Sequence, residues 1–301
     1  MTITINSSIM KVANANINTG DDFVSECNSC PSNGGCSKDK ENCMVKNNPY
    51  NNVKKIIGVM SGKGGVGKSS ISVLIARHLK EMGYSVGILD ADVTGPSIPN
   101  LMGLRGKKAE TNEEFILPVE TQSGIKTISL NLLLQDENQP VIWRGPLISG
   151  AVKQFWTDVI WGELDYLVID MPPGTADVAL TVMQSIPISG LVMVSIPQEL
   201  VSMIVSKAVN MAKAMNISIL GVIENMSYIT CPDCGKKIKF FNGKNTEKFL
   251  KEMNLKFLGE LPMLSSVSNL SEQGSESIDE SLKKIFNPIV TNIINSLEEK
   301  R

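Results

Sequence analysis

A glycine-rich segment in the first third of the chain constrains the fold more than any other feature. Ser61-Gly62-Lys63-Gly64-Gly65-Val66-Gly67-Lys68-Ser69-Ser70 follows a short apolar run, residues 54–60, and precedes a stretch of helical pattern, residues 69–82. Residues 62–69 fit G-x-x-x-x-G-K-[ST] in the strand–loop–helix context that this motif requires. Glycines let backbone N–H groups surround phosphate oxygens, and the helix N-terminus adds its positive dipole end. The segment therefore predicts a nucleotide-binding α/β domain.

Within this motif each residue type has a chemical reason. We expect the backbone of the whole loop to hold the phosphates of ATP, and the ammonium group of Lys68 to reach the β- and γ-phosphates. The hydroxyl of Ser69 is the expected ligand of Mg²⁺. The candidate nucleotide-binding residues are Gly62, Lys63, Gly64, Gly65, Val66, Gly67, Lys68, Ser69 and Ser70.

Short β-branched runs alternate with helical stretches along the rest of the chain. This alternation is typical of parallel βαβ units, so we predict an α/β fold with a mostly parallel twisted sheet and helices on both faces. A final helical stripe, residues 282–297, is expected to pack on that sheet, with Pro288 either kinking it or opening a second helix capped by Asn287. The expected strands are residues 54–60, 85–89, 166–169, 191–196 and 217–223.

The composition changes near residue 52. Residues 1–52 are rich in Asn, hold four of the six Cys and contain few large apolar side chains. Such a segment cannot form a core of its own, and we expect it to be flexible unless a metal organises it. We therefore divide the chain into an N-terminal Cys-containing segment, residues 1–52, and an α/β domain, residues 53–301.

Charge and hydropathy exclude several classes of protein. The 29 Lys+Arg and 31 Asp+Glu give a net charge of −2, which disfavours a nucleic-acid-coating protein. No apolar run reaches the 18 or so residues of a membrane span, and the first residues lack the pattern of a secretory signal. We expect a cytoplasmic protein that binds neither nucleic acid nor membrane. In that reducing compartment cysteines are more often metal ligands or redox groups than disulfides.

Carboxylates follow two of the expected strands. Asp90 and Asp92 come after the run 85–89, and Asp170 comes directly after the run 166–169. An acid just past a buried strand lies at the carboxyl edge of the sheet, where ligands bind in open α/β folds. A lone Asp at such a place often caps a turn instead. Next to a phosphate loop, we expect these acids to serve the nucleotide site.

The second lysine of the loop, Lys63, makes the chain similar to the deviant-Walker family, which includes the nitrogenase iron protein, MinD and ParA. That resemblance implies a homodimer in which Lys63 contacts the partner's nucleotide. It also implies that Asp170 orients Mg²⁺, that Asp92 positions the attacking water, with Asp90 able to share that role, and that Asn225 contacts adenine. Further motifs resemble the Mrp/ApbC iron–sulfur carrier ATPases over about residues 53–301. They are residues 90–99, 143–146, 170–175, 223–227 and 231–234.

Cys231-Pro232-Asp233-Cys234 supplies two thiolates, whereas tetrahedral zinc or an iron–sulfur cluster normally needs four ligands. A twofold-symmetric dimer would bring four sulfurs to its axis. The carrier family places a [4Fe–4S] cluster there, so the resemblance implies a bridging cluster on Cys231 and Cys234. A zinc knuckle with other ligands and a thioredoxin-like redox pair are the alternatives.

The N-terminal cysteines Cys27, Cys30, Cys36 and Cys43 could bind one cluster or one zinc within a single chain. Their first part is similar to the N-terminal cluster motif of eukaryotic cytosolic scaffold ATPases of this family. In those proteins the fourth cysteine lies upstream, at a spacing that corresponds here to Ala13. Cys43 can substitute for it; zinc and loose thiols without a metal stay open.

These observations lead to one functional hypothesis and two rivals. The first is a homodimeric ATPase that assembles [4Fe–4S] clusters, receives them from a donor and transfers them to apo-proteins, with slow ATP hydrolysis acting as a switch. In it Lys63, Lys68 and Mg²⁺ stabilise developing charge, and Asp92 positions the water. The rivals are a MinD- or ParA-like partner switch with a structural zinc knuckle, and a reductase-like ATPase that drives electron transfer. The single histidine, His78, is expected to be a packing or surface residue.

Overall fold

The computed structural model describes residues 44–112, 114–136, 143, 145–175, 177–197, 199–231, 233–239, 244–263 and 280–299. Cys27, Cys30, Cys36 and Cys43 lie outside these residues, so the hypotheses about them stay predictions. Of the motif 143–146, Arg144 also lies outside.

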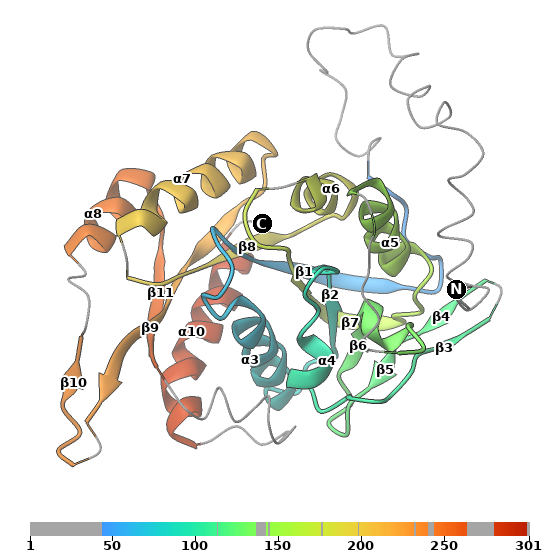
Figure 1. Cartoon of the computed structure of the whole chain (residues 1–301), viewed down its shortest axis with the longest axis horizontal. Coiled ribbons are helices and arrows are strands. Elements are labelled where there is room, and N and C mark those ends of the chain that lie inside the picture. The colour runs from blue at the N-terminus through green and yellow to red at the C-terminus, as the bar shows by residue number, and fades with distance from the viewer. Residues whose placement is uncertain are drawn as a thin grey trace, which may run out of the picture.

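The fold is a mostly parallel sheet covered by helices on both faces, as predicted (Figure 1). Its strands lie in the order β10-β9-β8-β1-β7-β2-β6-β5, and β11 pairs with β9 as well. The pairs among β11, β9, β8, β1, β7, β2 and β6 are parallel, whereas β10 and β5 join the sheet antiparallel to β9 and β6. The phosphate-loop strand β1 is therefore central, and the carboxyl ends of its neighbours meet at one edge.

The five expected strands are all present and most extend beyond their apolar runs. They are β1 (Asn52–Ser61), β2 (Val86–Asp90), β7 (Glu163–Asp170), β8 (Gly190–Ser195) and β9 (Ile219–Thr230). The strands that sequence reasoning missed are short or lie near the sheet margins. These are β3 (Glu110–Thr111), β4 (Ile116–Leu117), β5 (Val119–Glu120), β6 (Lys126–Ile128), β10 (Lys237–Ile238) and β11 (Phe257–Pro262).

Among the described residues, helices cover both faces of the sheet and fall into two groups (Figure 1). Helices α3 (Lys68–Glu81) and α10 (Glu280–Glu298) form the first group. The second comprises α5 (Gly145–Thr157), α6 (Asp177–Ser185), α7 (Glu199–Ala214) and α8 (Lys244–Met253). Helix α4 (Ile98–Leu101) and the 3₁₀ turn η2 (Leu130–Leu132) are short connections.

Strand β1 shows how the two cores form. Its side chains alternate, so Ile57 and Val59 pack beneath α3 and α10, while Ile56 and Met60 pack against the opposite helices. A strand buried on both faces reads as a continuous apolar run, which is why β1 was recognisable from its sequence.

Helix α10 confirms the terminal helical stripe as a packed element, with Phe286 and Ile293 fully buried. It continues through Pro288 as one helix, so the alternative of a second helix capped by Asn287 is wrong. His78 is 1% exposed, its ring lies 4.8 Å from that of Phe286, and its Nδ1 lies 2.8 Å from the Leu74 carbonyl oxygen. It is therefore a packing residue, as expected.

The residues just before β1 lie against the second helix layer. The Val45 amide donates to the Ser185 carbonyl oxygen at 3.1 Å, and the Trp156 indole donates to the Val45 carbonyl oxygen at 3.1 Å. The Asn51 amide group donates to the Val159 carbonyl oxygen at 2.8 Å. These contacts attach residues 45–51 to the domain.

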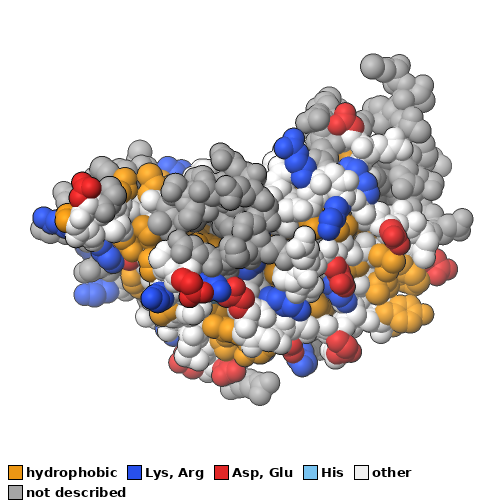
Figure 2. Space-filling model, turned by 90° about the horizontal axis from the view of Figure 1, so that it is seen from below, with side chains coloured by type: hydrophobic (Ala, Val, Ile, Leu, Met, Phe, Trp, Pro, Cys, Tyr) orange, Lys and Arg blue, Asp and Glu red, His pale blue; other side chains and the backbone are white. Residues whose placement is uncertain are grey.

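The surface carries both signs of charge. Among the described side chains on the face in Figure 2, Lys and Arg are interspersed with Asp and Glu and form no continuous basic patch. No helix in the described part of the chain has the length and hydropathy needed to span a bilayer.

Gly87 offers a test of the packing on the second face. A Cβ added there would lie 2.8 Å from Leu164 Cδ1 and 3.0 Å from both Leu167 Cδ1 and Trp161 Cε3. We expect Gly87→Ala to lower the free energy of unfolding by about 1–3 kcal/mol, because overpacking forces side chains off their rotamers. Urea denaturation measures this, with Gly95→Ala as control, since nothing lies within 4 Å of a Cβ at Gly95. Equal stability of the two variants would contradict the packing described here.

Candidate functional site

The phosphate loop connects the end of β1 to the start of α3. Gly65 and Gly67 have φ angles of +80° and +82°, in the left-handed region that favours glycine. Nothing lies within 4 Å of a Cβ at Gly64 or Gly65, so the loop backbone is open on that side. The loop is held from behind by two bonds: the Ser61 hydroxyl donates to the Lys63 carbonyl oxygen at 2.9 Å, and the Gly174 amide donates to the Ser61 carbonyl oxygen at 2.9 Å.

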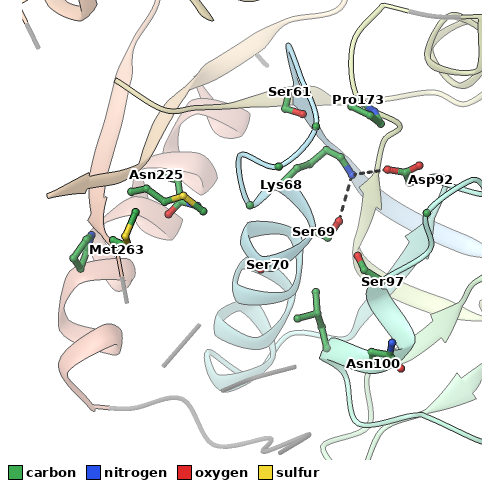
Figure 3. A pocket seen from close by; sticks show the side chains of 17 residues that line it. Ser61, Lys68, Ser69, Ser70, Asp92, Ser97, Asn100, Pro173, Asn225 and Met263 are labelled. Carbon is green, nitrogen blue, oxygen red and sulfur yellow. Dashed lines mark hydrogen bonds and ion pairs between the residues drawn. The ribbon is translucent and has the colours of Figure 1, made fainter. Parts of the chain in front are cut away.

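Lys68, Ser69 and Asp92 lie close together beside this loop (Figure 3), and Asp170 contacts the first two. The Lys68 ammonium nitrogen lies 2.8 Å from Asp170 Oδ2 and 3.7 Å from Asp92 Oδ2. The Ser69 hydroxyl donates to Asp170 Oδ2 at 2.7 Å. Asp170 is fully buried and Lys68 is 6% exposed, so each charge compensates the other in a site where an unpaired charge would be costly.

Asp90 holds the loop that carries Asp92. Its two carboxyl oxygens accept the Asp92 amide at 3.2 Å and the Ile98 amide at 3.4 Å, and the Ser129 hydroxyl donates to it at 3.0 Å. Burial, and after it the charge of Asp170, raises the pKa of Asp90 to about 8. Burial also raises the pKa of Asp92, with the Lys68 ammonium opposing it. The two acids thus occupy different positions: Asp90 lies beneath the loop and Asp92 faces Lys68.

Asn225 lies on β9 and contacts the phosphate loop at Val66 and Gly67. Its amide group donates to the Val66 carbonyl oxygen at 2.9 Å, and it fills the space where a side chain on Gly67 would lie. The next residue, Met226, has a φ angle of +54°, which is uncommon outside glycine. Asn225 therefore fixes the phosphate loop as well as lining the cleft.

A cleft of about 730 Å³ lies over the loop. It brings together most of the predicted nucleotide residues: Gly64, Gly65, Gly67, Lys68, Ser69, Ser70, Asp92 and Asn225. Gly62, Lys63 and Val66 belong to the loop but not to the cleft lining among the described residues. Lining residues that sequence reasoning did not propose are Ser61, Gly95, Ser97, Asn100, Leu101, Pro173, Met226, Pro262 and Met263.

Sequence reasoning did not propose two serines whose hydroxyls donate to the buried acids. The Ser72 hydroxyl donates to Asp170 Oδ1 at 2.7 Å, and Ser129 holds Asp90. Ser72 lies one helical turn after Ser69, a spacing that could have identified it. Ser129 follows β6, and its proximity to Asp90 depends on a sheet order that no local pattern gives.

Cys231 and Cys234 lie away from the cleft, in the turn between β9 and β10. The Cys231 amide donates to the Lys236 carbonyl oxygen at 3.0 Å, and the Gly235 amide donates to the Cys231 carbonyl oxygen at 2.9 Å. The backbone N–H groups of Cys234 and Asp233 lower the pKa of the Cys231 thiol. Cys234 is exposed, and within the described ranges no group of three or more His, Cys, Asp or Glu side chains could hold a metal ion.

Comparisons with known proteins identify the family of the chain. The profile of a ParA-type family described as "NUBPL iron-transfer P-loop NTPase" matches residues 52–298. The chain belongs to this iron-transfer P-loop NTPase family. The match spans β1 to α10 and includes both the phosphate loop and the cysteine turn.

Relatives of this iron-transfer NTPase carry a shared name. An iron-sulfur cluster carrier protein of Clostridium perfringens (strain 13 / Type A) is 48% identical over 256 residues, 83% of this chain and 89% of that protein. An iron-sulfur cluster carrier protein of Methanocaldococcus jannaschii is 43% identical over 284 residues, 92% of this chain and 98% of that protein.

Solved structures share the fold. The nucleotide-binding protein of Archaeoglobus fulgidus in complex with ADP is 44% identical, with a TM-score of 0.66 over 74% of this chain and 87% of that chain. The MinC:MinD cell division complex of Aquifex aeolicus is 16% identical, with a TM-score of 0.59 over 81% of this chain and 96% of that chain; this likeness concerns the fold alone.

The raised pKa of Asp90 gives a pH-dependent prediction. The folded carboxyl keeps its proton up to about pH 8, whereas the ordinary pKa of an aspartate is 3.8, so between these values the folded state binds more protons than the unfolded state. Stability should therefore fall as the pH rises through this window, by at most about 1.4 kcal/mol per pH unit from this group. Asp90→Asn removes the ionisation, and we expect its unfolding free energy to decline less between pH 5 and 8 than that of the parent. Parallel pH profiles in urea denaturation would contradict the assignment.

Proposed function

We propose that the protein binds and hydrolyses ATP and assembles and transfers [4Fe–4S] clusters to apo-proteins, receiving them from a cluster donor. Its family is described as iron-transfer, and relatives at 40–48% identity bear the name iron-sulfur cluster carrier protein. These descriptions favour cluster transfer over the partner-switch and reductase-like rivals.

The observation that carries the proposal is that one strand serves both sites. Strand β9 contributes Asn225 to the phosphate loop and ends one residue before Cys231. A nucleotide site and a pair of accessible thiols are thus joined by one strand, whose backbone between them departs from the extended form at Met226. A carrier whose cluster affinity responds to ATP needs such a connection.

In the proposed hydrolysis, water attacks the γ-phosphate in line with the leaving β-phosphate oxygen. Asp92 faces the cleft and would orient this water, while the Lys68 ammonium would leave Asp170 to neutralise charge on the phosphates. Asp90 would keep the Asp92 loop in place through its two backbone amides. We propose that turnover is slow and that ATP acts chiefly as a switch.

The residues beside the loop fit a magnesium ion. The Ser69 hydroxyl and Asp170 Oδ2 lie 2.7 Å apart, and hydroxyl and carboxylate oxygens are the donors that Mg²⁺ prefers. A magnesium ion held there would supply positive charge that offsets the charge of the phosphates. Ser69 would bind it directly, and Asp170, held by Ser72, would orient its water ligands.

We propose that the working unit is a homodimer. A four-sulfur site needs Cys231 and Cys234 from two chains, and exposed apolar side chains lie beside the nucleotide cleft. Met263 at the cleft is 51% exposed, and Met203, close to the contact between Ile204 and Gly62, is 63% exposed. In this dimer Lys63 would act on the partner's nucleotide. A cytoplasmic location and a cluster on Cys27, Cys30, Cys36 and Cys43 remain predictions.

The two loop lysines can be separated by substitution. We expect Lys68→Ala to lose most ATP affinity and at least about 100-fold in hydrolysis, because it removes the charge beside the β- and γ-phosphates. Lys63→Ala should lose hydrolysis to a similar degree yet keep most of its ATP affinity, because its ammonium would act across the dimer. Calorimetric ATP titration and phosphate release measure the two quantities, with the exposed Lys107→Ala as control.

Two outcomes would contradict this assignment of the lysines. Hydrolysis at the parent rate by Lys68→Ala would refute the phosphate-loop role. Loss of ATP affinity by Lys63→Ala equal to that of Lys68→Ala would show that Lys63 serves its own subunit.

The cluster site is tested by Cys231→Ala combined with Cys234→Ala. We expect loss of the bridging cluster and of transfer to an apo-acceptor, because two thiolates per chain complete a four-ligand site only in pairs. ATP affinity should stay within about twofold of the parent, since the cleft lies elsewhere. Iron and sulfide content after anaerobic reconstitution, the electronic spectrum and transfer rates measure this.

The matched control replaces Cys27, Cys30, Cys36 and Cys43 with Ala and keeps the Cys231–Cys234 pair. It should retain transfer through the bridging site. Undiminished transfer by the Cys231/Cys234 variant would move the function to the N-terminal thiols. Zinc without sulfide in the reconstituted parent would overturn the carrier proposal.

A further inference from the structure

The turn that bears the thiols is only weakly attached through its backbone. We call residues 231 and 233–239 the thiol hairpin. Its strand β10 pairs with β9 through two residues, Lys237 with Thr230 and Ile238 with Ile229. Two ladder pairs alone give little stability to a hairpin in water. Side-chain contacts must therefore determine where the thiols lie relative to the domain.

One carboxylate from the neighbouring strand β11 supplies these contacts. The Lys239 ammonium lies 2.8 Å from Glu260 Oε2, and the Lys237 ammonium lies 3.4 Å from Glu260 Oε1. The Lys237 nitrogen also lies 4.2 Å from the centre of the Tyr228 ring. Burial acts to raise the pKa of Glu260, but the two ammonium groups and Ser227 together bring it below its usual value. Glu260 is therefore charged at neutral pH. It pairs with Lys237, the first residue of β10, and with Lys239, the residue that follows β10.

The same carboxylate is anchored to the domain. The Ser227 hydroxyl lies 2.8 Å from Glu224 Oε2 and 3.2 Å from Glu260 Oε2, and Glu224 and Ser227 are both buried. Glu224 precedes Asn225, whose amide group holds the phosphate loop. Two residues after Glu260, Pro262 and then Met263 line the nucleotide cleft. Glu260 thus lies on β11, contacts Ser227 of β9, and is placed between the cleft and the thiols along both strands.

We propose that Glu260 is a positioning residue that ties the thiol hairpin to β11, so that nucleotide in the cleft changes the accessibility of Cys231 and Cys234. Nucleotide that displaces Met263 or Asn225 moves the ends of β11 and β9, and the Glu260 contacts carry that movement to Lys237 and Lys239. Only the consequence for cluster release rests on the proposed function. The first test of the proposal needs no cluster.

That test measures alkylation of Cys231 and Cys234 in the full-length apo-protein. Iodoacetamide labelling, resolved by peptide mass spectrometry, is timed with and without a non-hydrolysable ATP analogue. We expect at least a threefold change in rate on adding nucleotide to the parent, and a ratio near one in Glu260→Gln. The ratio is informative because loss of the Glu260 charge alters thiol reactivity equally in both nucleotide states.

Three further variants separate positioning from stability. Lys239→Gln should lose the nucleotide response as Glu260→Gln does, and the double variant should lose no more than either, as for groups acting through one contact. Lys54→Gln is the matched control, because Lys54 and Asp165 form an exposed pair of the same 2.8 Å distance elsewhere on the sheet. It should keep the parent response. Because exposed ion pairs contribute little to stability, melting temperatures should differ by only a few degrees, and ATP hydrolysis by less than twofold.

An unchanged labelling rate in the parent on adding nucleotide would overturn the proposal, as would a parent-like ratio in Glu260→Gln or a lost ratio in Lys54→Gln. A second measurement times cluster transfer to an apo-acceptor with and without ATP, and Glu260→Gln should lose the ATP effect. If the parent binds no cluster at Cys231 and Cys234, the proposed function fails while the labelling result still decides the role of Glu260.

Discussion

The buried carboxylate of Asp170 is the contact on which the rest of the site depends. It ends β7, the immediate neighbour of β1, and three groups of α3 converge on it: the Lys68 ammonium, the Ser69 hydroxyl and the Ser72 hydroxyl. A fully buried acid is tolerated only where such partners surround it. The geometry of the phosphate loop is thus set by a bond between two elements about 100 residues apart, and by the parallel strand order that brings them together.

Features of the fold and site that depend on residues close together in the sequence could be predicted, and features that depend on distant segments could not. The phosphate loop, β1 and α3 were recognisable because glycine spacing and apolar periodicity are local properties. Asp90, Asp92 and Asp170 could be placed at one sheet edge because each lies within three residues of the end of an apolar run. The partner of Asp90, Ser129, could not be found, because the position of β6 beside β2 is not encoded in either segment alone.

The short strands β10 and β11 were missed for a different reason. β10 has only two residues, and β11 is interrupted by register shifts against β9, so neither has a period to detect. As a result the contacts of Glu260 with Lys237 and Lys239 could not be found from the sequence, although the two lysines closely follow the predicted cysteine motif. The bond from the Asn225 amide group to the loop backbone was also not foreseen, and the expected contact of Asn225 with adenine stays a prediction.

The length of β9 limits how its two ends can influence each other. Five residues lie between Asn225 and Cys231, so the chain between them spans at most about 20 Å at 3.3 Å per residue. Any influence of one end on the other would therefore have to pass through the strand and the side chains that pack on it, rather than through direct contact between a phosphate and the sulfurs.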